Sequence, residues 1–335
     1  MLTIPDVLRR RAQRGTLDTE RYDPYWIIRR LHSLNRANSE NVPGMRRMER
    51  RYAVARKRKM PEANAQEMLE TACRLAREAA TRSLANLGRA AVDRKPDGSL
   101  VTETDYEIQQ LILDEIAREY PQHAVIAEEV LDQPDRHADR TAARYCWVVD
   151  PLDGTRNYAA TFPCFATSIA VLDRGTPLVG VVLEHVTGRI HTAIRGAGAA
   201  MGGDAIRVRE PDPDRDWIVG IESSKHPDSL RVLQDWLARP GIICRNLGSA
   251  AYHLALVASG ALDASFCRKC AIWDIAAGCV LITEAGGTVI NPFGGVRVPF
   301  NLADDQSALT PILAGRADVV DKLAATIRAV TGGSP

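Results

Sequence analysis

The chain has 335 residues, of which 45% are apolar and 25% are charged, and this composition argues against intrinsic disorder, collagen-like repeats and coiled-coil rods. The formal net charge of +1 combines two unlike parts. Residues 1–60 carry 16 basic and 6 acidic residues, a net charge of +10, whereas residues 61–335 carry 27 and 36, a net charge of −9. We therefore expect a basic N-terminal extension joined to an acidic folded body.

The basic extension, residues 1–60, ends in RRMERRYAVARKRKM. Its charge suits nucleic acid or anionic lipid, but the aromatic interleaving of a base-stacking surface is missing. We therefore expect a solvated or partly helical arm, and this arm leaves a nucleic-acid partner open as the less favoured alternative. No apolar run has the length of a membrane span or of a signal-peptide core. Seven cysteines at irregular spacing favour a reducing compartment. We therefore expect a cytoplasmic protein without a membrane partner.

The first half of the body is predicted to contain two helices followed by consecutive strands. Apolar residues recur at helical spacing from Glu62 to Leu87. A second helix is expected from about Thr104 to Tyr120, because Pro121 disfavours its continuation. Five β-type runs follow, the last two as a hairpin across Thr187–Gly188: AVIAE at 124–128, CWVVD at 146–150, ATSIAVL at 166–172, PLVGVVLEHV at 177–186 and RIHTAI at 189–194.

Strands and helices alternate in the second half. The predicted strands are residues 217–222, 241–246, 262–266, TVI at 288–290 and PILAG at 311–315. The predicted helices are residues 227–238, 249–259 and 274–285, and one that begins near residue 316. Consecutive strands followed by alternation predict a mixed α/β, layered fold, which we divide into halves at residues 61–200 and 201–335.

Acidic residues gather at the ends of predicted strands and helices. Glu128 and Glu129 follow the run AVIA, Asp150 ends the run WVV, and Asp153 follows two residues after Pro151. Asp274 stands at the head of a helix. If these ends converge, the carboxylates repel one another unless cations lie between them. Hard oxygen ligands on a compact site are typical of Mg²⁺ or Mn²⁺.

The segment DPLDGT, residues 150–155, is predicted to be a turn with two tasks. Pro151 restricts the backbone so that the two aspartates can point the same way, with the carbonyl of Leu152 exposed between them. Gly154 and Thr155 can offer peptide N–H groups to a phosphate at a helix N-terminus. Metal ligands and anion-binding amides in one segment indicate phosphoryl chemistry.

Four motifs, in this order, resemble the inositol monophosphatase family, within the wider group of Mg²⁺-dependent, lithium-sensitive phosphatases. They are KPDGSLVTETD at 95–105, VIAEEV at 125–130, WVVDPLDGTRNY at 147–158 and WDIAAG at 273–278. Weaker matches are RGAGAAMGG at 195–203, GSAAYHLALVASG at 248–260 and TEAGG at 283–287. The resemblance implies a layered α/β/α/β/α sandwich, commonly a homodimer, with Mg²⁺ or Mn²⁺ as cofactor and Li⁺ as an inhibitor.

The resemblance also implies a role for each matching residue. The implied metal ligands are Glu128, Asp150, Leu152 through its carbonyl, Asp153 and Asp274. The implied substrate contacts are Asp153, Gly154, Thr155 and Ala250. Glu129 would contact the metal ligands without binding the metal itself. The attacking water is activated either by the Thr155–Asp105 pair or near Glu128, which makes these three residues the candidate catalytic groups.

The alcohol part of the substrate is less strongly indicated. The run RNYAATFP after DPLDGT resembles inositol monophosphatases and favours inositol-1-monophosphate. The family places a hydroxyl-binding glutamate where this chain has Cys267, and the following Arg268 and Lys269 could hold a second phosphate unless this loop faces solvent. The alternatives are therefore a 3′(2′),5′-bisphosphate nucleotidase, a fructose-1,6-bisphosphatase and a histidinol-phosphate phosphatase.

We expect a phosphomonoesterase that hydrolyses a small phosphate ester by direct attack of a metal-activated water. A different class of function is a catalytically inactive binding or regulatory module, with the basic extension engaging RNA or a protein. The presence of every expected metal ligand argues against that alternative.

Overall fold

The computed structural model describes residues 63–129, 138–210, 212, 214–294, 298–303 and 310–332. Residues Pro61–Pro335 form one compact unit. The basic extension predicted at residues 1–60 lies outside the described residues. Among the described helices, none is both long enough and apolar enough to cross a bilayer.

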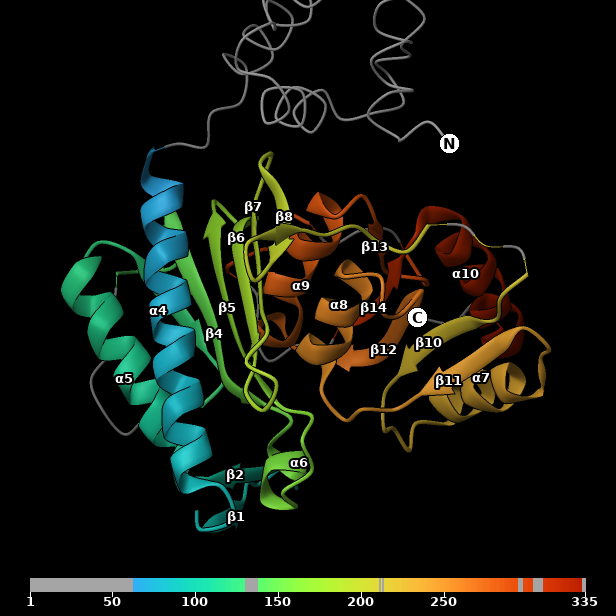
Figure 1. Cartoon of the computed structure of the whole chain (residues 1–335), viewed down its shortest axis with the longest axis horizontal. Helices are drawn as coiled ribbons and strands as arrows, with labels where there is room; N and C mark the ends of the chain where they lie inside the picture. Colours follow the sequence, from blue (N-terminus) through green and yellow to red (C-terminus); the bar gives the residue numbers. More distant parts are fainter. Residues whose placement is uncertain are drawn as a thin grey trace, which may run out of the picture. The chain divides into compact units, whose positions relative to one another are not determined.

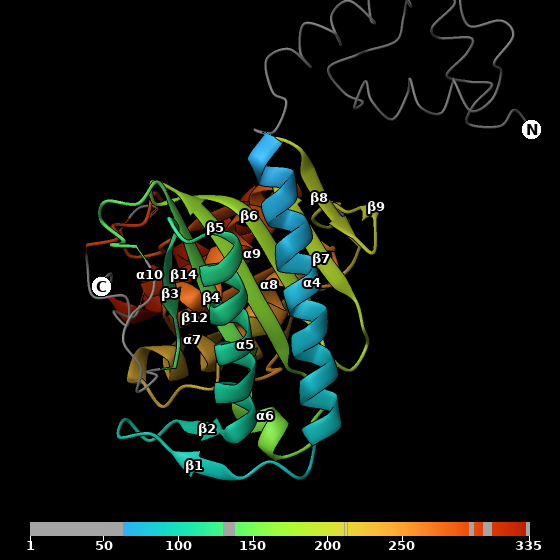
Figure 2. The ribbon, with the colours of Figure 1, turned by 90° about the vertical axis from the view of Figure 1, so that its left-hand side faces the viewer.

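Helices and sheets alternate in five layers in the described part of the chain (Figure 1), so the predicted α/β/α/β/α sandwich is confirmed. The helices on the outer face of the first sheet are α4 (Ala63–Asn86) and α5 (Glu103–Glu119), which Figure 2 shows side by side in front of it. The central helices are α8 (Ala250–Ala258) and α9 (Ile272–Glu284). The helices beyond the second sheet are α7 (Pro227–Ala238) and α10 (Ala317–Thr331).

The first sheet has seven strands, which lie in chain order. They are β3 (Ala124–Ala127), β4 (Tyr145–Asp153), β5 (Ala166–Asp173), β6 (Thr176–Glu184), β7 (Ile190–Ile194), β8 (Gly198–Met201) and β9 (Asp204–Ala205). The predicted hairpin of β6 and β7 is present. Strands β8 and β9 were not predicted, because their glycine-rich sequence lacks the alternation of a strand. The division into halves at residue 200 stays a prediction.

The second sheet has five strands in the order β11-β10-β12-β14-β13. They are β10 (Trp217–Ile221), β11 (Ile242–Arg245), β12 (Ala264–Cys270), β13 (Thr288–Ile290) and β14 (Thr310–Gly315). Strand β10 is parallel to both neighbours, β11 and β12. Strand β12 continues to Cys270, so the segment CRKC, which we expected to be a loop, is part of a strand whose register shifts between Cys267 and Cys270.

Two shorter elements complete the first half. Strands β1 (Val92–Arg94) and β2 (Leu100–Thr102) form an antiparallel ribbon that leads into α5. The five-residue helix α6 (Thr155–Ala159) follows β4. Neither strand was predicted, because three residues are too few to show a hydrophobic alternation.

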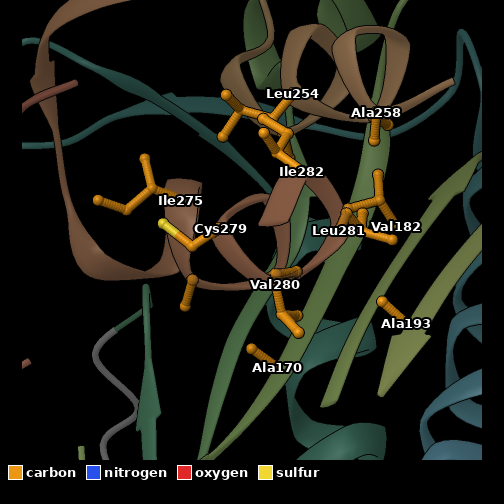
Figure 3. Close-up of a cluster of buried hydrophobic side chains, with 14 of the residues drawn as sticks. Ala170, Val182, Ala193, Leu254, Ala258, Ile275, Cys279, Val280, Leu281 and Ile282 are labelled. Carbon is orange, nitrogen blue, oxygen red and sulfur yellow. The ribbon is translucent and has the colours of Figure 1, made fainter. Parts of the chain in front are cut away.

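The two central helices are buried on nearly every side because each layer of the sandwich must cover the next. Figure 3 shows Val280 and Leu281 of α9 among apolar side chains from α8 and from strands of the first sheet. Contact is closest at two glycines. A Cβ atom on Gly180 of β6 would lie 2.4 Å from Val280 Cγ1, and one on Gly278 of α9 would lie 2.4 Å from Leu254 Cδ1. These close contacts fix the position of the middle of α9 against the first sheet and against α8.

We expect Gly180→Ala to lower the free energy of unfolding by about 1–3 kcal/mol, because the added methyl group overfills a packed layer. The backbone carbonyl oxygen of Ala277, 2.7 Å from the added Cβ, cannot give way as a side chain can. Chemical denaturation measures the change. Gly294→Ala is the matched control, since no atom lies within 4 Å of its added Cβ. Equal stability of the two variants would contradict the packing argument.

Candidate metal centre

Three of the predicted ligands lie together. One oxygen from each of Asp150, Asp153 and Asp274 lies within 4.8 Å of the other two. The first two come from the end of β4 and the third from the first turn of α9. Burial raises the pKa of Asp150 well above its usual value, and repulsion from Glu128 and the other two aspartates raises it further. A divalent cation with hard oxygen ligands relieves this repulsion, so the three side chains fit Mg²⁺ or Mn²⁺.

An irregularity in β4 makes two of these aspartates point the same way. Residues three apart on a regular strand face opposite sides of the sheet. The pairing of β4 with β5 shifts register between Asp150 and Asp153, as at a β-bulge, and this cancels the alternation. Pro151, which has no N–H to donate to the ladder, is tolerated at such a position. The predicted turn at DPLDGT is therefore the irregular end of a strand followed by α6.

The N-terminus of α8 holds Asp153 from the other half of the sequence. The Ser249 hydroxyl donates to Asp153 Oδ2 over 2.7 Å, and the Ala251 N–H donates to the same oxygen over 2.5 Å. Ala250, the predicted substrate contact, lies between them as the first residue of α8. Burial raises the pKa of Asp153 to about 6 although these two donors lower it. The N-terminus of α8 thus orients the carboxylate of Asp153, a candidate metal ligand on β4.

The predicted pair Thr155 and Asp105 is in contact. Thr155 Oγ1 lies 3.0 Å from Asp105 Oδ1 and 3.2 Å from the carbonyl oxygen of Leu152. Asp105 is fully buried, and its other oxygen accepts hydrogen bonds from the N–H and the hydroxyl of Thr102, the residue before α5. Burial raises the pKa of Asp105 to about 6, against the lowering effect of these hydrogen bonds. The carboxylate can therefore exchange a proton near neutral pH.

Gly154, the predicted phosphate contact, joins β4 to α6 in a conformation that few other residues adopt. Its φ of 96° lies in the left-handed region. A Cβ atom there would lie 2.9 Å from the carbonyl oxygen of Cys164. Because both the backbone angle and the space require glycine, the position of Thr155 depends on it.

Glu128 and Glu129 share one cation that sequence analysis did not single out. Lys95 Nζ lies 2.9 Å from Glu128 Oε1 and 2.7 Å from Glu129 Oε1. Burial alone would lower the pKa of Lys95, but the two carboxylates outweigh burial and raise it. Burial and the charge of Glu128 raise the pKa of Glu129 to about 7. Glu128 is not among the three clustered aspartates, but its carboxylate is within hydrogen-bond reach of Asp150.

Gln109 of α5 holds the backbone behind this carboxylate pair. Its side chain accepts from the Glu129 N–H over 2.8 Å and donates to the Glu129 carbonyl over 2.6 Å. Two sequence signals could have found these partners. Lys95 opens the motif KPDGSLVTETD, and Gln109 stands next to Ile108, one of the apolar residues that set the face of the predicted helix.

A buried chain of hydrogen bonds ties the bulge to α4. The Ser83 hydroxyl lies 2.6 Å from His185 Nδ1, and His185 Nε2 lies 2.8 Å from the Thr167 hydroxyl. Thr167 in turn donates to the carbonyl of Pro151 over 2.8 Å. Burial lowers the pKa of His185 to about 3, so its ring is neutral at physiological pH. The bulge between the two aspartates is therefore supported from the outer helix layer.

The two cations proposed for a second phosphate lie in different surroundings. The Arg268 side chain is only 10% exposed, lies 3.2 Å from Asp228 Oδ2 and stacks 4.9 Å from the ring centroid of Phe293. Lys269 is exposed. The guanidinium is thus already engaged within the protein, and only the lysine side chain extends into solvent.

Comparison with known proteins gives one consistent family. The sequence model of the inositol monophosphatase family matches residues 64–329. A Vibrio cholerae protein named Nus factor SuhB is 34% identical over 238 residues, which are 68% of this chain and 86% of that protein. Rat inositol monophosphatase 1 is 30% identical over 71% of this chain and 87% of its own length.

Solved structures agree. The extragenic suppressor protein suhB of Bartonella henselae superposes with a TM-score of 0.70 and 26% identity, covering 78% of this chain and 98% of that one. An IMPase of Thermotoga maritima gives a TM-score of 0.68 and 27% identity over 79% of this chain and 98% of its own.

We expect the metal-free protein to lose stability as the pH rises from about 4 to 6. The folded state raises the pKa values of Asp105 and Asp153 to about 6, so it binds protons more tightly than the unfolded chain. That stabilisation is present at low pH and is lost as the pH passes the folded pKa. Mg²⁺ should oppose the loss, because it binds ionised carboxylates. Thermal unfolding with and without a chelator measures both effects.

Asp153→Asn should flatten this pH dependence, whereas Asp321→Asn, at an exposed position on α10, should leave it as in the unmodified protein. The stabilisation by Mg²⁺ should be larger near pH 7.5 than near pH 5. A metal effect of the same size at both pH values would show that the aspartates do not bind the ion.

Proposed function

Because the chain belongs to the inositol monophosphatase family, we propose that it is a Mg²⁺-dependent phosphomonoesterase acting on a small phosphorylated polyol, with inositol-1-monophosphate as the leading substrate. The observation that carries the proposal is the cluster of Asp150, Asp153 and Asp274 beside the hydrogen-bonded pair of Thr155 and Asp105. The cluster supplies ligands for the cation, and the pair supplies a proton acceptor. Together these are the groups that hydrolysis of a phosphate ester needs.

Mg²⁺ held by Asp150, Asp153 and Asp274 would lower the pKa of a bound water and stabilise the alkoxide that leaves. Asp105 orients the Thr155 hydroxyl by accepting its proton in a hydrogen bond. The Thr155 oxygen can then accept a hydrogen bond from the attacking water. With a pKa raised to about 6 by burial, Asp105 can take up the proton that the water loses.

The surroundings of Arg268, one of the two cations considered for a second phosphate, support a monophosphate substrate over a bisphosphate. Arg268 already pairs with the Asp228 carboxylate and stacks on Phe293, so its charge is partly balanced within the protein and is a weaker attraction for a second phosphate. A binding or regulatory role is the second candidate, and the name Nus factor carried by the Vibrio relative favours it. The aspartate cluster makes catalysis the first candidate function.

The proposal extends to inhibition by Li⁺, a homodimer and a cytoplasmic location.

We expect the purified protein to hydrolyse inositol-1-monophosphate only with Mg²⁺ or Mn²⁺ present. Asp150→Asn should lower kcat/KM by at least about 100-fold, because changing even a residue that only supports a metal ligand costs about 10–100-fold. Release of inorganic phosphate measures the rate. Histidinol phosphate and nucleotide or sugar bisphosphates should be poorer substrates. Loss of the same size in Asp321→Asn, or turnover without divalent metal, would contradict the proposal.

We expect Thr155→Val to lower kcat by about 100-fold or more while KM changes little, because general base catalysis is worth about 10²–10⁴-fold. Valine keeps the shape of threonine but has no hydroxyl to align with Asp105. Steady-state kinetics separate the two parameters, and thermal unfolding with Mg²⁺ checks that the metal still binds. If kcat stays within threefold, the water is activated elsewhere, and Glu128 becomes the candidate.

A further inference from the structure

A carboxylate that the sequence analysis did not single out stands beside the metal centre. Glu222 directly follows β10, whose last residue, Ile221, pairs in parallel with Phe266 of β12. Ligands of α/β sheets bind beyond the carboxyl ends of parallel strands, and Glu222 occupies that end of β10. Strand β12 continues past it and leads through Ala271 into α9, which carries Asp274.

The Glu222 carboxylate is held in place by three donors. Ser229 of α7 donates to Oε1 over 2.7 Å. The Cys267 thiol, 3.0 Å away, and the Lys269 N–H, 3.3 Å away, donate to Oε2. All three donors are neutral, so they orient the carboxylate without cancelling its charge. An ionised carboxylate offers about four acceptor positions, so one remains for a further donor.

Two thiols connect this carboxylate with the metal ligands. Cys267 and Cys270 are in hydrogen-bond contact with each other, and each interacts electrostatically with both Glu222 and Asp274. A regular strand would direct residues three apart to opposite faces, and the register shift in β12 cancels that alternation. The bulge therefore brings Glu222, the thiols and Asp274 into one neighbourhood.

The cysteine at position 267 acts here as a donor. Its hydrogen bond with Cys270 favours the thiolate, but burial and the charges of Glu222 and Asp274 outweigh it and raise the pKa of the thiol to about 11. The proton therefore stays on Cys267 at neutral pH and points to Glu222 Oε2. The neighbouring Arg268 pairs with Asp228.

We propose that the oriented carboxylate of Glu222 selects the alcohol part of the substrate by accepting a hydrogen bond from a free hydroxyl of a phosphorylated polyol. The inference rests on the proposed phosphatase function and adds the residue that recognises the leaving alcohol. A hydroxyl fits the remaining acceptor position, whereas a second phosphate would meet an uncompensated negative charge. This carboxylate follows β10 and lies beside Cys267, a thiol that cannot accept hydrogen bonds as a carboxylate does.

The test compares two esters that share the phosphate but differ in the alcohol: inositol-1-monophosphate, with free hydroxyls, and phenyl phosphate, with none. Glu222→Gln should raise KM for the inositol ester about 10–100-fold, since a hydrogen bond to a charged group is worth about 1.5–3 kcal/mol. The kcat for both esters and the KM for phenyl phosphate should change far less. The Gln variant should also discriminate less against a sugar bisphosphate.

Ser229→Ala is the second variant, because it leaves the charge in place and removes only the donor that orients Oε1. It should raise KM for the inositol ester by a smaller factor and leave phenyl phosphate turnover nearly unchanged. Lys269→Ala tests the competing hypothesis. The inference is overturned if Lys269→Ala loses turnover of bisphosphates alone while Glu222→Gln changes no kinetic parameter. The residue that recognises the alcohol part would then be the lysine.

Equal losses on both esters in Glu222→Gln would also overturn it, because Glu222 would then support the site as a whole. Thermal unfolding in the presence of Mg²⁺ shows whether either variant has lost its fold or its metal, and a loss of either in both variants would likewise assign Glu222 a structural role. If the unmodified protein hydrolyses neither ester, the proposed function fails, and the inference that rests on it fails too.

Discussion

Repulsion among three carboxylates is the constraint on which the centre of this protein depends. Oxygens of Asp150, Asp153 and Asp274 lie within 4.8 Å of one another, and two of these residues are at the end of a single strand. Each is held by a different anchor: the register shift in β4, the N-terminus of α8 and the first turn of α9. The packing of the five layers must outweigh this repulsion until a cation binds.

The other charged side chains near the three aspartates do not take the place that a bound metal ion would occupy. Lys95 pairs with Glu128 and Glu129, and among the described residues no basic side chain forms an ion pair with any of the three aspartates. Asp105 is buried among hydrogen-bond donors and faces Thr155. One side of the candidate site is therefore suited to a metal ion and the other to proton transfer. Burial contributes to both, because it raises the pKa values of Asp153 and Asp105 alike.

The regular elements could be predicted because their signals are local. Helix α7 begins and ends at the predicted residues 227 and 238, and the paired strands β6 and β7 lie where the hairpin was expected. Short elements were missed. Strands β1 and β9 are too short and too polar to show a period, and the CRKC segment carries the charges of a loop although it is part of β12. Pairing with β14, far along the chain, makes it a strand.

The sequence by itself determined the candidate metal ligands and the family. The three clustered aspartates lie within DPLDGT and WDIAAG, two short contiguous motifs that can be recognised without knowing the fold. The tertiary structure decided which side chains complete the site. Lys95 reaches Glu128 across 33 residues, and Glu222 meets Cys267 across 45. Such contacts leave no periodic trace in the sequence, because a side chain's partner on a neighbouring strand is set by sheet order and register. The candidate ligands are therefore encoded locally in the sequence. Their charge balance and the proposed recognition of the alcohol depend on contacts that form only when the layers assemble.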